Sequence, residues 1–152
     1  MTHAALATTS TPHHKAVVRG CYAALDTGNL DEAFALLTPD YLVHLPDRPE
    51  PVALAEYERT AADMYRAFPD LQHAIEEMVA EGDRVAVRLT ARGTQRGALG
   101  ALPATGRPMA IVETAFFRLC DSRIAEQWPQ VDTLGMLQQL GAMPRGDEGN
   151  HA

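Results

Sequence analysis

The spacing of apolar residues changes once along this chain, and the change divides it into two structural halves. Between Leu54 and Phe68, apolar residues recur at helical intervals and form one face of a long helix that Pro69 ends. From Leu71 onward they alternate with polar neighbours, which is the period of a strand with one buried side. Helices followed by hairpin strands are typical of an α+β domain, in which helices pack on one face of a largely antiparallel sheet.

Capping and turn residues set the boundaries of the other elements. Thr11 and Pro12 provide an N-cap and a first-turn proline for a helix that Gly28 ends. Asn29 can cap a second helix, which Pro39 stops. The sequence therefore predicts helices at 12–28, 30–38 and 54–68, strands at 41–45, 71–79, 85–91, 109–119 and 124–131, and a tail helix at 134–140.

The size and composition of the chain indicate one folded domain. A length of 152 residues is near the commonest domain size, and 46% hydrophobic residues exclude the profile of a disordered protein. We expect the domain to span residues 11–141, with disordered ends at 1–10 and 142–152.

The charge of the chain argues against nucleic-acid partners. It carries 20 acidic and 13 basic side chains, a net charge of −7 that repels phosphate backbones and anionic lipid head groups. Four arginines recur at every fourth position in and around the third predicted strand, which places them on one side of an extended chain. We expect this side to face solvent or an interface, with a contribution to a pocket as the alternative; the residues are Arg84, Arg88, Arg92 and Arg96.

Neither a metal site nor a membrane segment is predicted. Cys21 and Cys120 stand in no CxxC or other ligand-like spacing, so we interpret both as small core residues. The N-terminus lacks the pattern of a signal peptide, and no apolar run approaches the ~18 residues of a membrane span. We expect a cytoplasmic protein that uses no metal and no cofactor.

The stretch IAEQWPQVDTLG places a tryptophan and a carboxylate on one side of the last strand. Alternation puts Glu126, Trp128, Gln130 and Asp132 on that side. If it lines an enclosed apolar pocket, Asp132 becomes a stronger base than a solvated aspartate. In the alternative interpretation, Asp132 caps the tail helix and Trp128 belongs to the core.

From Ala16 to Gly141 the sequence resembles the SnoaL-like polyketide cyclases of the nuclear transport factor superfamily. The segments that carry the resemblance are CYAALDTGNLDEAFALLTPDYLVH, FPDLQHAIEEMVAEGDRVAVRLTARGTQRG, TGRPM and RIAEQWPQVDTLGMLQQLG. One position departs from the family pattern: the histidine often found before the tryptophan is Gln127 here. Because Gln127 points away from the Trp128 side, we expect this departure to weaken the family match more than the mechanism, and it leaves the substrate open.

The resemblance implies a fold and a reaction. The fold is a cone of three helices against a curved sheet whose wide end opens to substrate, commonly in a homo-oligomer formed through the outer sheet face. In the reaction, an acidic carbon of an aromatic polyketide ester loses a proton, and the enolate attacks a ketone of the same molecule to close a ring. The family's acid/base is an aspartate at the end of the last strand, which matches Asp132.

Several other residues are candidates for contacts with a small hydrophobic or aromatic substrate. Tyr22 and His44 can hydrogen-bond to substrate carbonyls, although a purely structural role is the alternative for each. Glu113 and His73 also lie on predicted strands, but the pattern does not assign their faces. The predicted substrate-binding residues are Tyr22, His44, Phe68, Trp128 and Gln130.

Three further functions are compatible with the same fold. A ketosteroid-isomerase-like enzyme would need a base such as Asp47 and two proton-donating groups, for which the sequence offers no obvious pair. An epoxide-hydrolase-like enzyme would need an arginine and an aspartate two apart, which the stretch MAIVETAFFRL lacks. The third is a non-catalytic small-molecule-binding module.

Overall fold

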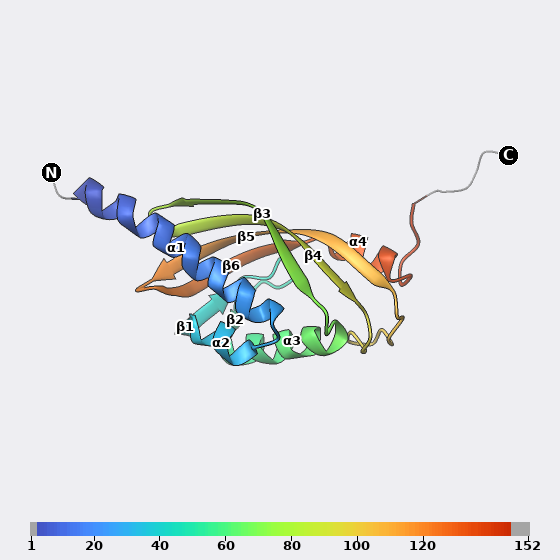
Figure 1. Ribbon diagram of the computed structural model, residues 1–152. Coiled ribbons are helices and arrows are strands. Elements are labelled where there is room, and N and C mark those ends of the chain that lie inside the picture. The colour runs from blue at the N-terminus through green and yellow to red at the C-terminus, as the bar shows by residue number, and fades with distance from the viewer. Residues whose placement is uncertain (1–2, 147–152) are drawn as a thin grey trace.

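A computed structural model describes residues 3–146 (Figure 1). The four helices are α1 (His3–Asp26), α2 (Leu30–Ala35), α3 (Leu54–Ala67) and α4 (Thr133–Gln139). The six strands are β1 (Leu37–Val43), β2 (Val52–Ala53), β3 (Gln72–Glu81), β4 (Arg84–Thr94), β5 (Pro108–Cys120) and β6 (Arg123–Val131).

One curved sheet holds all six strands in the order β2-β1-β6-β5-β4-β3. Its pairs are antiparallel except β1 with β6, which run parallel. Helix α1 crosses the sheet and contacts β3, β4 and β6, while α3 packs beside β1 and β2 (Figure 1). The α+β class expected from the switch in period is confirmed, with N-terminal helices on one face of a mostly antiparallel sheet.

Alternation along β4 defines an inner face, covered by helices, and an outer face. Val85, Val87, Leu89 and Ala91 are buried on the inner face. Arg84, Arg88 and Arg92 are exposed between them and share the outer face, as the four-residue spacing predicts. Arg96 does not join them, because β4 ends at Thr94.

Three element boundaries differ from the expectation. Helix α1 begins at His3, eight residues before Thr11, because the Ala-rich stretch before Pro12 contains no helix breaker. Pro39 lies inside β1 instead of ending α2, and the pairing of β1 with β6 is irregular around it, as a missing N–H requires. The short strand β2 lies in the segment predicted to be loop, where Val52 and Ala53 pair with the end of β1. Disorder was predicted for residues 1–10 and 142–152, but α1 covers residues 3–10; residues 1–2 and 147–152 lie outside the described residues.

A β-bulge in β3 moves two apolar side chains to unexpected faces. The register between β3 and β4 shifts between Ile75 and Glu77, so one extra residue enters β3. Because the side-chain period is two, the shift turns Val79 outward and places Met78 on the inner side opposite Val87. Strict alternation along β3 was therefore the wrong expectation for Val79.

The two cysteines occupy different environments. Cys21 is half-buried on α1, and burial raises the pKa of its thiol to about 12. Cys120 is exposed at the end of β5, so its prediction as a core residue was wrong. Its position at a strand end next to the turn at Asp121 keeps it out of the core.

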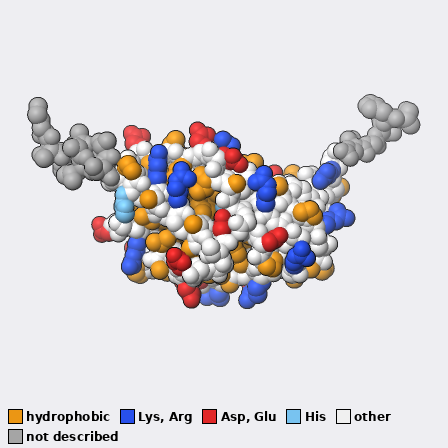
Figure 2. All heavy atoms as spheres, viewed as in Figure 1, with side chains coloured by type: hydrophobic (Ala, Val, Ile, Leu, Met, Phe, Trp, Pro, Cys, Tyr) orange, Lys and Arg blue, Asp and Glu red, His pale blue; other side chains and the backbone are white. Residues whose placement is uncertain are grey.

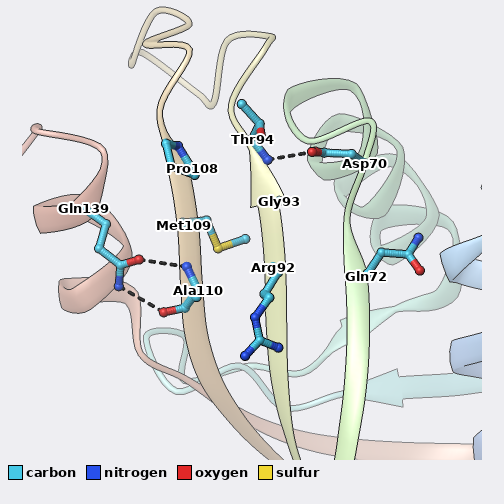
Figure 3. A pocket seen from close by; sticks show the side chains of 9 residues that line it. All are labelled: Asp70, Gln72, Arg92, Gly93, Thr94, Pro108, Met109, Ala110 and Gln139. Atoms are coloured by element: carbon cyan, nitrogen blue, oxygen red, sulfur yellow. Dashed lines mark hydrogen bonds between the residues drawn. The ribbon is translucent and has the colours of Figure 1, made fainter.

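Helix α4 closes the edge of β5 beyond the end of β6. The side-chain amide of Gln139 accepts a hydrogen bond from the Ala110 N–H at 2.7 Å and donates one to the Ala110 carbonyl at 3.0 Å (Figure 3). This pattern replaces the strand neighbour that Ala110 lacks after β6 ends at Val131. Met136 and Leu140 bury the apolar side of α4 in the core. Among the helices described, none is long and apolar enough to cross a membrane.

Candidate active site

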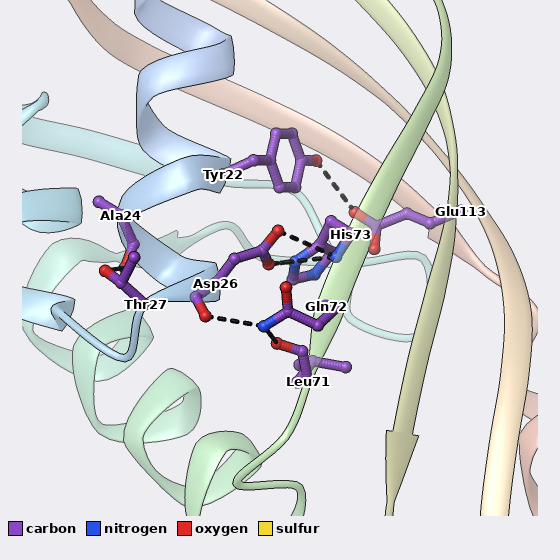
Figure 4. Close-up of polar contacts among 8 residues, drawn as sticks. All are labelled: Tyr22, Ala24, Asp26, Thr27, Leu71, Gln72, His73 and Glu113. Atoms are coloured by element: carbon purple, nitrogen blue, oxygen red, sulfur yellow. Dashed lines mark hydrogen bonds and ion pairs between the residues drawn. The ribbon is translucent and has the colours of Figure 1, made fainter.

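Four polar side chains meet between α1 and the inner face of the sheet (Figure 4). Tyr22 and Asp26 project from the last turns of α1, His73 lies near the start of β3, and Glu113 lies in the middle of β5. We call these four residues the interior cluster. Their spacing follows from the fold, because Tyr22 and Asp26 are four residues apart and share one side of α1.

Asp26 and His73 form a tight, largely buried pair. The Nδ1 atom of His73 lies 2.6 Å from Oδ1 of Asp26, and their side chains are 7% and 19% exposed for His73 and Asp26 respectively. The backbone N–H of His73 also donates to both carboxylate oxygens at 3.1 Å. Since a carboxylate only accepts, Nδ1 carries the proton and Nε2 of the neutral ring is a proton acceptor. No hydrogen bond to Nε2 occurs within the described part of the chain.

Glu113 and Tyr22 form a second pair beside the first. The hydroxyl of Tyr22 donates to Oε1 of Glu113 at 3.4 Å, and the Tyr22 ring lies 5.0 Å from that of His73. Burial raises the pKa of Glu113, and the hydrogen bond from Tyr22 opposes that shift. Burial likewise raises the pKa of Tyr22, so its hydroxyl stays protonated. The hydroxyl hydrogen of Tyr22 is therefore engaged with Glu113, and burial disfavours the ionised form of the Glu113 carboxyl.

Solvent reaches the inner face near the interior cluster. Glu113 is only half-buried although it lies between buried inner-face neighbours on β5. Val131, which pairs directly with Glu113, is 42% exposed. Tyr57 and Tyr65 of α3, which pack against the core, are also half-buried. The inner face is thus partly exposed where β6 ends at Val131, whereas its opposite end, around Phe117 and Ile124, is buried.

The interior contains a further tyrosine and glutamine pair. Tyr41 donates its hydroxyl hydrogen to Oε1 of Gln127 at 2.7 Å, and both side chains are buried. As expected, Gln127 and Trp128 point to opposite faces of the sheet. Gln127 points into the interior. The position at which this chain departs from the family pattern therefore faces the same side as the interior cluster.

The predicted substrate-binding residues divide between the two faces of the sheet. Tyr22 belongs to the interior cluster, and Phe68 is fully buried at the end of α3. Trp128 and Gln130 lie on the outer face, since Trp128 pairs with Phe116 and Gln130 with Thr114, both outward-facing.

His44 joins Trp128 on the outer face. The two rings stack with centroids 4.9 Å apart and planes 4° apart, and the Arg84 guanidinium lies 5.1 Å from the Trp128 ring. Glu126 connects this group, because its carboxylate contacts His44 Nε2 at 2.8 Å and accepts from Arg118 at 2.7 Å. These hydrogen bonds from His44 and Arg118 lower the pKa of Glu126. The structure thus separates this group from the interior cluster.

Asp132 lies at the end of β6 as the N-cap of α4. Its carboxylate accepts a hydrogen bond from the Gly135 N–H at 2.9 Å, and the residue is exposed. This is the position expected of a helix cap. Asp132 nevertheless follows Val131, the residue opposite Glu113, so it stands at the accessible end of the inner face.

A family model described as SnoaL-like polyketide cyclase matches residues 15–140. The chain belongs to the SnoaL-like polyketide cyclase family. The matched range contains all four residues of the interior cluster as well as Asp132. No curated protein matches this chain.

Solved structures of this family and its fold are similar over most of their length. IdmH, a proposed polyketide cyclase from Streptomyces antibioticus, is 32% identical, with a TM-score of 0.74 over 84% of this chain and 98% of that one. AclR, a proposed hydroxylase from Streptomyces galilaeus, is 26% identical, with a TM-score of 0.83 over 91% and 87%. TsrD from Streptomyces laurentii is 25% identical, with a TM-score of 0.76 over 87% and 97%.

Sequence reasoning left three members of the interior cluster unassigned. His73 has the same phase as Leu71 and Ile75, and Glu113 the same phase as Ile111 and Ala115, so alternation alone could place both inside. Nothing in the sequence indicated that Asp26 is a site residue, because a carboxylate in the last turn of a helix is ordinarily solvated. Its pairing with His73 depends on the contact between α1 and β3.

Other surface features of this family member are separate from the interior cluster. A groove of about 490 Å³ lies over the outer side of β3, β4 and β5, with Arg92 and Gln72 at its wall (Figure 3). On the face seen in Figure 2, Lys and Arg side chains are interspersed with acidic ones and form no continuous basic patch. Within residues 3–146, no group of three His, Cys, Asp or Glu side chains is arranged to hold a metal ion.

Proposed function

We propose that this protein closes a ring in an aromatic polyketide ester by cofactor-independent intramolecular aldol chemistry. The observation that carries the proposal is the interior cluster, in which a histidine oriented by an aspartate faces a protonated tyrosine and a carboxyl of raised pKa. A stabilised carbanion needs a positioned base and hydrogen-bond donors, and the cluster offers both.

In the proposed reaction, His73 removes one proton from the substrate and later returns it to the product. Nε2 of His73 takes a proton from the carbon between two carbonyl groups, and Asp26 stabilises the imidazolium that forms. The enolate carbon then bonds to a ketone carbon of the same molecule, and the ketone oxygen becomes an alkoxide. The imidazolium returns the proton to this alkoxide. Glu113 in its protonated form donates a hydrogen bond to the enolate oxygen while that oxygen carries charge, and the Tyr22 hydroxyl holds Glu113 in place.

The relatives favour ring closure over epoxide hydrolysis. The family description is a polyketide cyclase, and IdmH, at 32% identity, is a proposed polyketide cyclase. The arginine and aspartate pair of an epoxide hydrolase is also missing from the inner face of β5, where Ile111, Glu113 and Ala115 follow one another.

A ketosteroid-isomerase-like proton transfer is the second candidate, because Glu113, held by Tyr22, supplies a buried carboxyl that the sequence did not reveal as a donor. A carboxylic acid kept protonated by an apolar site is the device that such isomerases use at the enolate oxygen. The base predicted for this reaction, Asp47, is exposed in the loop after β1, so His73 would take its place. Isomerisation and ring closure share the enolate and differ in whether a carbon–carbon bond forms.

The experiment that tests the proposal distinguishes His73 from Asp132 as the base, by removing the carboxylate of Asp132. Deuterium exchange at the acidic carbon and ring closure would be followed by mass spectrometry for wild type and Asp132→Asn. Asn keeps the cap on α4, so with His73 as the base we expect turnover within about threefold of wild type and unchanged folding. A fall of roughly 10²-fold to 10⁴-fold would instead make Asp132 the base, as the family resemblance predicts. Wild type that neither exchanges the proton nor closes the ring would refute the proposal.

We further propose that the outer sheet face joins two copies of the chain. Phe116, Val79 and Val112 are 58%, 57% and 51% exposed there, and Phe116 and Val112 lie on β5, an interior strand of the sheet. Phe116→Glu is expected to convert an oligomer into a monomer in sedimentation experiments at micromolar concentration. Leu134→Glu, on an exposed position of α4, is the matched control and should leave the sedimentation unchanged. A monomeric wild type would contradict this proposal.

A further inference from the structure

One arginine on the outer face of β4 has no partner in the described part of the chain. Arg84 lies 3.4 Å from the Asp83 carboxylate, and Arg88 lies 3.4 Å from the Glu77 carboxylate. Arg92 shares this face, but its guanidinium makes no ion pair and no hydrogen bond within residues 3–146. An arginine in this state keeps its full capacity to donate to an anion.

Strand pairing explains why Arg92 lacks a partner. It lies opposite Gln72 on β3 and Ala110 on β5, and neither of these residues carries a charge. The Gln72 side-chain amide is already engaged, because it donates to the Asp26 carbonyl at 2.8 Å and to the Leu71 carbonyl at 3.1 Å. The N–H groups of the Arg92 guanidinium are therefore left for a ligand.

Arg92 lines the groove of about 490 Å³ that lies over β3, β4 and β5 (Figure 3). This volume is in the range of small-molecule sites. Pro108 and Ala110 are exposed in the groove and give it an apolar wall. Gln139 of α4 spends one amide hydrogen on the Ala110 carbonyl, so its second N–H is left as a neutral donor. The groove thus combines a cation, a neutral donor and apolar surface.

The carboxylate that lines the groove, Asp70, is already compensated. It accepts a hydrogen bond from the Thr94 N–H at 2.7 Å, which lowers the pKa of Asp70, and the charge of Arg96 adds to that shift. With Asp70 balanced by Arg96, the charge of Arg92 makes the groove locally positive in a chain of net charge −7. A local excess of positive charge attracts anions to the groove.

We propose that this groove binds a small organic carboxylate, whose two oxygens pair with the Arg92 guanidinium and whose apolar body covers Pro108 and Ala110. The planar fork of a guanidinium matches both oxygens of a carboxylate. An inorganic anion would use Arg92 but leave the apolar wall uncovered. The site lies on the outer face of the sheet, so it is separate from the interior cluster and does not depend on the proposed ring closure.

The groove and the proposed contact between two copies of the chain occupy different parts of the outer face. Phe116 is six residues from Ala110 along β5, which is about 20 Å at the rise of a strand. A second copy seated in the groove is the alternative occupant, and sedimentation of an Arg92 variant distinguishes it from a small ligand.

Titration of the isotope-labelled protein with benzoate, followed by NMR, tests the site. We expect a Kd of about 1 mM, the range for a ligand of this size at an open groove, with shifts of the Thr94 backbone and Gln139 side-chain amide signals. Benzamide has the same ring without the charge, and inorganic phosphate has the charge without the ring. Each should bind about tenfold more weakly than benzoate.

Three variants assign the binding to Arg92. Arg92→Gln should raise the benzoate Kd about tenfold, because a charge-assisted pair is lost. Arg88→Gln, on the same face, is the matched control and should leave the Kd within about twofold, since Arg88 is already paired with Glu77. Ala110→Glu places a carboxylate opposite Arg92 and should raise the Kd as much as Arg92→Gln does.

Four outcomes would overturn the proposal. They are a wild type that does not bind benzoate, an unchanged benzoate Kd in Arg92→Gln, binding of benzamide or phosphate as tight as that of benzoate, and conversion of an oligomer into a monomer by Arg92→Gln. The last outcome would show that a second copy of the chain occupies the groove.

Discussion

Replacing His73 with asparagine is expected to lower the rate of proton exchange and ring closure by roughly 10²-fold to 10⁴-fold, the usual contribution of a positioned general base. The amide nitrogen of asparagine can occupy the region of Nδ1 and keep a hydrogen bond to Asp26, but the side chain has no group in place of Nε2. The measurement is the turnover number at matched thermal stability, with deuterium exchange recorded in parallel.

A matched control separates the interior histidine from the outer one. His44→Asn removes a histidine that also contacts a carboxylate, but this histidine is more exposed than His73 and lies on the opposite face of the sheet. Its turnover should equal that of wild type. Comparable rate losses in the two variants would indicate general damage to the fold, and a His73→Asn enzyme within twofold of wild type would remove His73 from the mechanism.

Replacing Glu113 with alanine is expected to lower turnover by roughly 10²-fold to 10³-fold, because a hydrogen-bond donor to the enolate oxygen is lost. Glu113→Gln keeps an N–H donor of similar reach and should lose less than tenfold. A larger loss of turnover in Glu113→Ala than in Glu113→Gln is expected only if Glu113 acts as a neutral hydrogen-bond donor. If Glu113 acted as an ionised base, the glutamine variant would be as slow as the alanine variant.

The same pair of enzymes, wild type and Glu113→Gln, should differ in the pH dependence of stability. Burial raises the pKa of Glu113 above its unfolded value, so its carboxyl stabilises the fold fully below the ordinary pKa of about 4.3. That contribution is lost as the pH rises through the folded-state pKa. Relative to Glu113→Gln, wild type should therefore lose free energy of unfolding as the pH rises above about 4.3, as measured by chemical denaturation. A constant difference would show that the carboxyl has its usual pKa.

Local sequence patterns were sufficient for most of the fold. The helical spacing between Leu54 and Phe68 and the alternation from Val85 to Ala91 each reflect burial of one side of one element, which neighbours in the chain determine. The exceptions are residues whose conformation or facing depends on how their strand pairs with its neighbour. Pro39 is tolerated in β1 by an irregularity in the pairing with β6, and Val79 faces outward because of a bulge in β3.

The candidate site was harder to predict because alternation gives the two sides of a strand but not which side is inside. Trp128 and Gln130 were correctly grouped on one side of β6, yet that side is the outer face, and the polar Gln127 is the inward residue. An aromatic residue would ordinarily be assigned to the core. Here stacking with His44 and the cation of Arg84 cover Trp128 instead, and those partners come from outside β6, at the end of β1 and the start of β4.

The hydrogen bonds of Gln139 to the edge of β5 have a consequence for handling this protein. A strand edge that is left open can recruit another chain and start aggregation, and here one side-chain amide blocks it at Ala110. Tags and fusion partners are therefore better attached after Gly141, where the helix has already ended, than in place of α4. A shortened chain that stops before Gln139 would leave the edge of β5 open at Ala110, so its solubility would depend on whatever the fusion supplied there.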